Sequence, residues 1–173
     1  MTESKNNASK TSTSRTHKSP AEFLFQWLTE NAFEQVGYVG SVPALPGPLQ
    51  DQVVLKDCND LQPWHASSGD TALQAVVISD GLADRSQQEV TQLLAGYRNA
   101  LVGAILVLMD VSGDPVLADN DFYGLGFKKI AEFPHPEHPL AAFEYNLRSY
   151  NHKRLWNNPK YWANPENFGK YWW

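Results

Sequence analysis

The chain has 173 residues, 42% of them hydrophobic, and a formal net charge of −5. This size and composition suit one domain with a core large enough to fold without a metal or a disulfide. The single cysteine, Cys58, excludes an intramolecular disulfide and suits a reducing compartment. No apolar run approaches membrane-spanning length and no apolar leader is present, so we expect a cytoplasmic protein without membrane contact.

The charge is distributed unevenly along the chain. Residues 1–19 and 151–173 each carry +3, and the 131 residues between them carry −11. An acidic body disfavours wrapping by nucleic acid, although either basic end alone could contact phosphates. The simpler interpretation is that the basic ends lie against the acidic body.

The first third of the chain predicts a tail, a helix and a strand. Residues 1–18 are rich in Ser, Thr, Asn and Lys without apolar periodicity, which predicts a disordered basic tail. The segment 19–22, Ser-Pro-Ala-Glu, is a capping box and predicts a helix to about Asn31. A short buried strand is expected over 35–40. Residues 41–51 contain three prolines and a glycine, which forbid an ordinary crossover helix.

The remaining pattern alternates strands and helices. The run over 73–79 is almost uniformly apolar, as in a strand buried on both faces of a parallel sheet. The connection 134–139 is too short for a parallel crossover, so the last two strands should form an antiparallel hairpin at the sheet edge. Strands are expected over 52–56, 73–79, 104–109, 128–133 and 141–147, and helices over 85–101 and 119–126.

This alternation predicts a three-layer, Rossmann-like α/β domain over 19–150, with a mostly parallel sheet that ends in an antiparallel hairpin. In this respect residues 20–150 resemble the class I S-adenosylmethionine-dependent methyltransferase fold. In that family a glycine-rich loop follows the first strand, an acidic residue that ends the second strand holds the ribose, and an acidic residue that ends the fourth lies beside the methyl donor. The resemblance therefore implies that Gly40, Asp57 and Asp80 are the cofactor-binding residues.

The segment after Gly40 departs from that family. It continues with Ser41, Val42 and Pro43, and the next glycine is Gly47. A methyl donor needs glycines that allow close backbone approach and a helix N-terminus that meets its carboxylate. The prolines remove both features, so we expect no cofactor, or S-adenosylmethionine if the cleft is intact.

Residues 151–173 form an aromatic, basic C-terminal extension that holds four of the six tryptophans. Its ending, WANPENFGKYWW from Trp162 to Trp173, resembles the shared C-terminus of an uncharacterised bacterial protein family with a degenerate methyltransferase-like domain. Exposed rings of this size are costly in water, so we expect the extension to contact its own domain, a partner or nucleic acid. The candidate contact residues are Trp156, Tyr161, Trp162, Phe168, Tyr171, Trp172 and Trp173.

The extension also offers cover for the sheet. If no helix fits between the first two strands, part of one sheet face needs another segment to bury it. We expect the aromatic residues between Trp156 and Phe168 to lie back along the domain and supply part of that layer. We expect the last residues, from Phe168 to Trp173, to bind a partner.

Three other clusters carry no chemistry in this interpretation. The loop with His135 and His138 offers too few ligands for a zinc site, so no metal is expected. Cys58 has no base or cation nearby in sequence that would make it a nucleophile. The polar run 119–121, Asp-Asn-Asp, is expected to cap the helix that follows.

Three functions are open at this point, and catalytic residues are not assigned. The first is a methyltransferase-like protein that has lost cofactor binding and serves as a binding or scaffold protein for an unknown protein partner. The second is an S-adenosylmethionine-dependent methyltransferase with a divergent cofactor loop. The third is association with single-stranded nucleic acid or the ribosome through the extension, where bases stack on aromatic rings and lysine and arginine meet phosphates.

Overall fold

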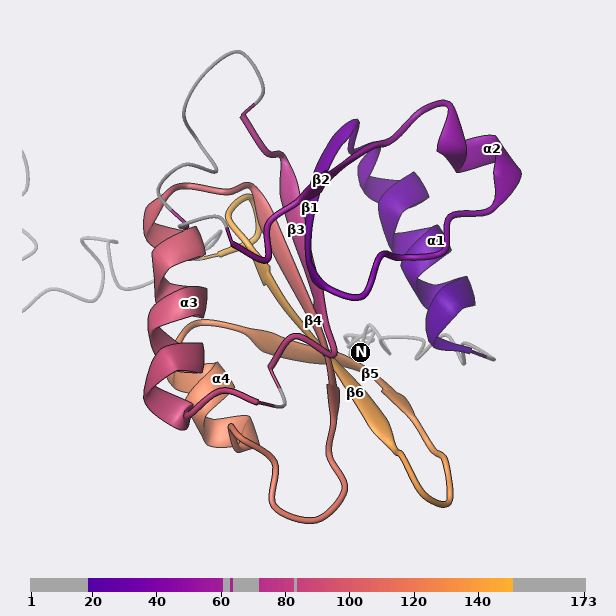
Figure 1. Cartoon of the computed structure of the whole chain (residues 1–173). Coiled ribbons are helices and arrows are strands. Elements are labelled where there is room, and N and C mark those ends of the chain that lie inside the picture. The colour runs from indigo at the N-terminus through magenta and orange to yellow at the C-terminus, as the bar shows by residue number, and fades with distance from the viewer. Residues whose placement is uncertain (1–18, 61–62, 64–71, 83, 151–173) are drawn as a thin grey trace, which may run out of the picture.

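The computed structural model describes residues 19–60, 63, 72–82 and 84–150. A six-stranded sheet lies between two layers of helices (Figure 1). Its strand order is β2-β1-β3-β4-β6-β5, with β1 to β4 parallel and β6 antiparallel to both neighbours. This confirms the predicted fold class. The elements are α1 (Pro20–Asn31), β1 (Gln35–Gly40), α2 (Gly47–Gln50), β2 (Val54–Asp57), β3 (Ala75–Ser79), α3 (Gln87–Asn99), β4 (Ala104–Asp110), α4 (Asp119–Gly124), β5 (Lys128–Phe133) and β6 (Leu140–Asn146).

Helix α1 covers one face of the sheet. The Ser19 hydroxyl accepts a hydrogen bond from the Glu22 amide at 3.1 Å, which is the predicted N-cap. The helix buries Phe23, Leu24, Trp27 and Leu28 against the sheet. The indole N–H of Trp27 donates to Glu144 Oε1 at 2.8 Å, so α1 is joined by a side-chain hydrogen bond to β6.

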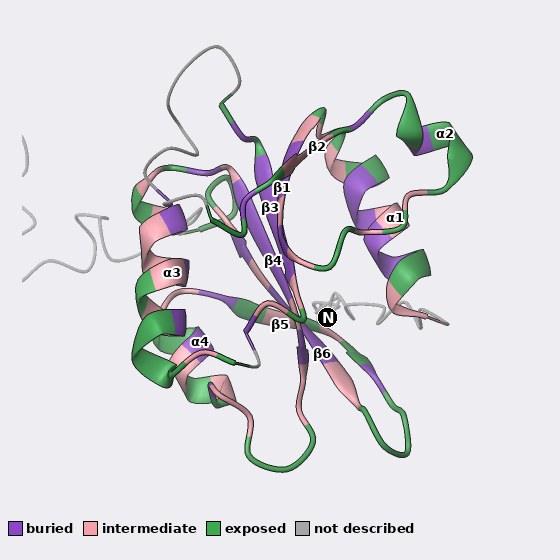
Figure 2. Cartoon of the chain, in the orientation of Figure 1, coloured by how far each residue is buried: buried purple, intermediate pink, exposed green. Residues whose placement is uncertain are grey.

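Helices α3 and α4 cover the opposite face (Figure 2). Helix α3 begins with a capping box in which the Ser86 and Glu89 side chains bond each other's backbone amides. From α4, Phe122 stacks on Phe143 of β6 with ring centroids 3.9 Å apart. Most side chains of β3 and β4 are buried, which explains why these strands are apolar except at their last residues, Ser79 and Asp110.

A short helix lies where the prolines were expected to prevent a crossover helix. Helix α2 has only four residues, and it starts directly after Pro46 with Pro48 in its first turn. Proline is tolerated there because the first-turn N–H groups have no intrahelical acceptor. Leu49 of α2 is buried on the α1 side of the sheet. The segment therefore forms one turn that covers part of the sheet, and the expectation that no helix fits there is corrected to this extent.

The start of α4 also differs from expectation. Its N-cap is Ala118, and of the three polar residues 119–121 it is Asp121 that bonds the helix start, accepting from the Ala118 amide at 2.9 Å. Asp119 instead pairs with Lys129 of β5 at 2.6 Å. The predicted tail 1–18 and extension 151–173, with the packing proposed for it, lie outside the described residues.

Candidate functional site

The strand order creates a topological switch point between β1 and β3. The chain leaves β1 toward β2 on one side, and β3 then adds on the other side. In open α/β sheets, ligands bind outside the carboxyl ends of the strands at this point. The residues that end these strands are Gly40, Ser79 and, in β2, Asp57. The carboxyl ends of these three strands therefore form the candidate functional site.

The loops after β1 and β3 touch each other at these strand ends. Gly40 has φ +91° and forms an isolated antiparallel bridge with Asp80. A Cβ on Gly40 would lie 1.5 Å from the Ser79 carbonyl oxygen, and one on Gly81 would lie 2.8 Å from the Gly40 nitrogen. Backbone therefore packs on backbone where a crevice between β1 and β3 would open.

Side chains hold this contact in place. The Ser41 hydroxyl donates to Asp80 Oδ2 at 3.0 Å. Asp80 itself adopts φ 56°, a left-handed conformation that aspartate tolerates better than most residues. In the same loop Arg85 donates from Nε to the Gly81 carbonyl oxygen at 2.9 Å. The chain after β3 is thus fastened both to β1 and to the start of α3.

Asn59 connects the end of β2 to the same place. Its Oδ1 accepts from the Gly40 amide at 2.7 Å, and its Nδ2 donates to Asp57 Oδ1 at 2.9 Å. The Asn59 amide also donates to Asp57 Oδ1 at 2.9 Å. This backbone hydrogen bond is the main reason that the pKa of Asp57 is lowered, with a further contribution from the Tyr38 hydroxyl. The exposed Asp57 carboxylate is ionised at neutral pH.

The structure thus brings together all three residues that the methyltransferase resemblance singled out, Gly40, Asp57 and Asp80. Sequence reasoning did not identify Asn59 and Ser41, whose side chains join them. The spacing of Asp57 and Asn59 is a signal that was available, because an aspartate commonly bonds the backbone amide two residues ahead.

The arrangement does not meet the requirements of a methyl donor on its glycine side. The Gly40 amide already has an acceptor in Asn59, and the Gly40 α-carbon faces the backbone of Ser79. Helix α2 is a single turn, so it offers no developed helix N-terminus to a carboxylate. Asp57 lies at the end of β2, where the ribose would be held. The space beside Gly40, where a glycine loop would contact the methyl donor, is occupied by the backbone around Asp80.

The histidines of the β5–β6 loop make local contacts. His138 Nδ1 lies 3.0 Å from Asp110 Oδ2, and His135 Nδ1 accepts from the backbone amides of Glu137 and His138 at 3.3 and 3.1 Å. Because its Nδ1 accepts, the neutral His135 ring carries its proton on Nε2 and offers no lone pair to a metal there. No group of three or more metal-ligating side chains occurs within the described residues.

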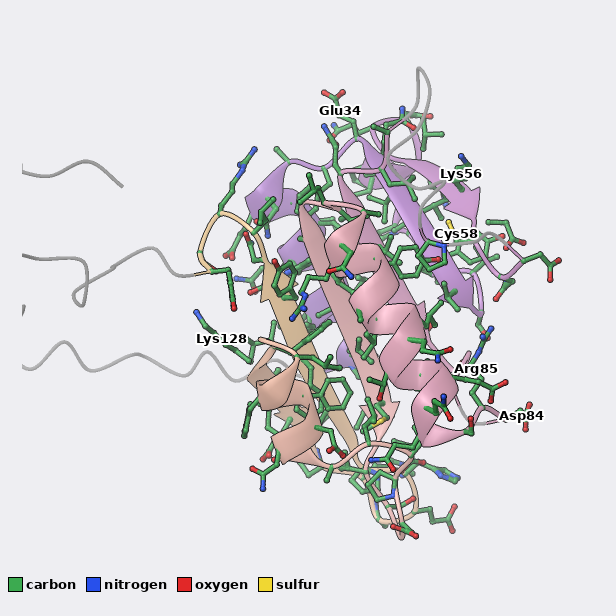
Figure 3. All side chains as sticks on the ribbon, turned by 90° about the vertical axis from the view of Figure 1, so that its left-hand side faces the viewer. Glu34, Lys56, Cys58, Asp84, Arg85 and Lys128 are labelled. Carbon is green, nitrogen blue, oxygen red and sulfur yellow. The ribbon has the colours of Figure 1, made fainter. Side chains whose placement is uncertain are left out.

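Cys58 lies in the core rather than at the edge. Its side chain is 1% exposed and sits on the face of the sheet that α3 covers (Figure 3). Burial raises the pKa of its thiol, and burial likewise raises the pKa of the neighbouring Tyr97. Both groups are therefore neutral at physiological pH, and a buried neutral thiol is a poor nucleophile.

Comparison with known proteins identifies the family but no activity. The model of a family of unknown function, DUF6231, matches residues 9–173, so the chain belongs to that family. The match includes the C-terminal extension. No protein of curated function matches the sequence.

Solved structures show the same fold in methyltransferases. The magnesium protoporphyrin IX methyltransferase from Synechocystis PCC 6803 with bound SAM aligns with a TM-score of 0.51 at 11% identity, over 72% of this chain and 76% of that one. The same enzyme with bound SAH gives 0.51 and 11%, over 72% and 80%. At this identity the likeness shows a methyltransferase-like fold alone.

No helix in the described part of the chain is long and apolar enough to cross a membrane.

Proposed function

We propose that this member of the DUF6231 family is a methyltransferase-like protein that does not use S-adenosylmethionine and acts instead as a binding or scaffold protein. The observation that carries the proposal is the backbone contact of Gly40 with Ser79 and Gly81 at the switch point. A methyl donor would have to separate these loops and displace Asn59 from the Gly40 amide. The partner in this proposal is another protein, bound in part through Phe168, Tyr171, Trp172 and Trp173.

Isothermal titration with S-adenosylmethionine and S-adenosylhomocysteine tests this directly. The expected result is no heat of binding at micromolar concentrations of a protein shown to be folded by circular dichroism. Micromolar binding of either compound would overturn the proposal.

The alternative is an S-adenosylmethionine-dependent methyltransferase with a divergent loop, and one observation favours it. Asp57 is exposed, ionised and placed at the end of β2, as a ribose-binding carboxylate would be. If the methyl donor binds, Asp57→Ala should abolish binding, whereas Asp51→Ala, an exposed aspartate just after α2, should leave it unchanged. Equal binding by both variants would exclude the switch point as the site.

Association with nucleic acid is a third candidate that rests on the basic, aromatic extension. Bases that stack on its rings would contribute about 1–3 kcal/mol each. The −11 charge of the body opposes it. Binding through the lysine and arginine side chains of the extension should weaken as salt increases, because these contacts release counterions from the phosphates. Absence of a salt-dependent mobility shift with single-stranded oligonucleotides would remove this candidate.

A further inference from the structure

Two hollows lie at the end of the sheet where the parallel strands begin, opposite the end that holds the switch point. The larger has a volume of about 430 Å³ and is formed by the end of α1, by α2 and by the starts of β1 and β2. Six of its ten lining residues are apolar. The apolar residues that line it are Leu28, Ala32, Phe33, Leu49, Val53 and Val54. Val54 belongs to the edge strand and is 57% exposed, so apolar surface beside the hollow is open to solvent.

The smaller hollow lies next to the larger one, on the side nearer the end of the described chain. It has a volume of about 160 Å³ and shares Ala32 and Phe33 with the larger hollow. Its far wall is formed by Asn146 and Arg148, which follow or end β6. The two hollows therefore lie side by side at this end of the sheet, from the end of β6 to β2, with Ala32 and Phe33 between them, and together they are called the furrow.

We propose that the furrow binds the chain's own C-terminal extension, with Tyr161 and Trp162 in the larger hollow. The described chain ends at Tyr150, whose ring packs against Tyr145 with centroids 5.4 Å apart. The extension begins at the next residue, three positions after Arg148 in the furrow wall. The proposal does not depend on the proposed function, because the furrow lies at the amino ends of the parallel strands and the switch point at their carboxyl ends.

Chain length selects the aromatic pair. Between β6 and β2 lie four strand spacings, which amount to about 19 Å. The six residues from Tyr150 to Trp156 span at most about 20 Å when fully extended, which leaves no length for turning around the edge. The twelve residues to Trp162 span up to about 40 Å and reach the larger hollow with length to spare.

Charge and chemistry agree with this occupant. Glu34 stands at the rim of the larger hollow and points into solvent (Figure 3). Lys160 directly precedes the aromatic pair and would meet this carboxylate. Aromatic rings with a polar tip suit a site that is apolar within and wet at its rim. The family match extends over this segment, so the extension belongs to the unit that the family shares.

Paramagnetic broadening in the full-length protein tests the proposal. A nitroxide is attached at Gln52→Cys, an exposed position that lines the larger hollow, or at Asn120→Cys, an exposed control position on α4 at the other face. Native Cys58 is buried and should not react. The indole N–H signal of Trp162, assigned with Trp162→Phe, should be lost with the label at position 52 and retained with the label at position 120. Retention in both samples would overturn the proposal.

A mixed sample distinguishes a second copy of the chain as the occupant. Spin-labelled, isotopically unlabelled protein is mixed with isotope-labelled protein that carries no nitroxide. Broadening of Trp162 in this mixture would mean that the extension binds another molecule, which also overturns the proposal.

Limited trypsin digestion provides an independent check. Val54→Asn removes an apolar side chain from the hollow, whereas Ile130→Asn alters a partly exposed apolar side chain on β5 at the other end of the sheet. Cleavage after Lys160 should be several-fold faster in the first variant than in the second. Equal rates would contradict docking at this furrow.

Discussion

Gly40 and Ser79 end neighbouring parallel strands and lie in backbone contact, so close that a Cβ on Gly40 would be 1.5 Å from the Ser79 carbonyl oxygen. Their strands flank the switch point, where an α/β sheet ordinarily opens to a ligand. The contact requires glycine at position 40 for two reasons. A side chain would have no space there, and the φ of +91° is rarely adopted by other residues. In this protein the glycine therefore brings two loops of the chain together at the place where a glycine loop would admit a cofactor.

The first prediction concerns that glycine. Gly40→Ala should destabilise the fold by roughly 2–5 kcal/mol, because alanine pays both for the left-handed conformation and for the clash with backbone. Gly47→Ala is the matched control, since a Cβ at Gly47 meets nothing within 4 Å. Urea denaturation measures both. A Gly40→Ala variant as stable as Gly47→Ala would mean that the loops separate easily, which would favour an openable cleft.

The second prediction concerns Asn59, which joins β2 to Gly40. Asn59→Ala removes the acceptor of the Gly40 amide and two hydrogen bonds to Asp57 or Gly40, at a cost of about 1–3 kcal/mol. Asn120→Ala on α4 changes an exposed asparagine and should have little effect. If thermal denaturation gave the same Tm for both variants, the network at the switch point would be of no consequence for stability.

The third prediction is a dependence of stability on acid. The pKa of Asp57 is lower in the folded protein than its ordinary value of 3.8, so the folded state binds a proton there less readily. The stabilisation is complete above that value and is lost as pH falls through the folded pKa. Asp57→Asn should therefore flatten the decline of Tm between about pH 5 and pH 2, whereas Asp51→Asn should leave the decline as in the wild type. Identical curves for wild type and Asp57→Asn would contradict the role assigned to this carboxylate.

The sheet could be predicted from the sequence because its central strands are buried on both faces. The sequence runs of β3 and β4 are almost uniformly apolar, and Asp80 and Asp110 mark their ends. The edge strand β2 begins at Val54, two residues later than predicted. Val53 is buried toward α2 and bonds Leu49, and pairing with β1 begins only at Val54.

The closed switch point could not be predicted, because it is a tertiary contact between loops far apart in sequence. The prolines after Gly40 indicated only that the family's cofactor loop was altered. That Asn59 takes the Gly40 amide, and that Ser41 reaches Asp80, depends on how three strand ends meet in space. The one-turn helix α2 differs from the prediction for a local reason, because proline breaks the interior of a helix but is accepted in its first turn, where Pro48 lies.

The fourth prediction concerns the hydrogen bond between Trp27 and Glu144, which joins α1 to β6 at 2.8 Å. Glu144→Ala leaves the indole N–H of Trp27, a residue only 6% exposed, without its acceptor, and should cost about 1–3 kcal/mol. Glu144→Gln keeps an acceptor oxygen and should restore most of the stability. If both variants lost the same stability in urea, the charge of Glu144 would matter and not its hydrogen bond.

The fifth prediction separates the two parts of the C-terminal extension. If Tyr161 and Trp162 dock on the domain, a chain that ends at Trp162 should keep the full Tm, because the docked pair is retained. A chain that ends at Tyr150 should lose about 3–6 kcal/mol of unfolding free energy, since each of the two buried large side chains contributes about 1.5–3 kcal/mol. Equal stability of full-length protein and both truncations, measured by calorimetry at one protein concentration, would mean that the whole extension is free to serve a partner.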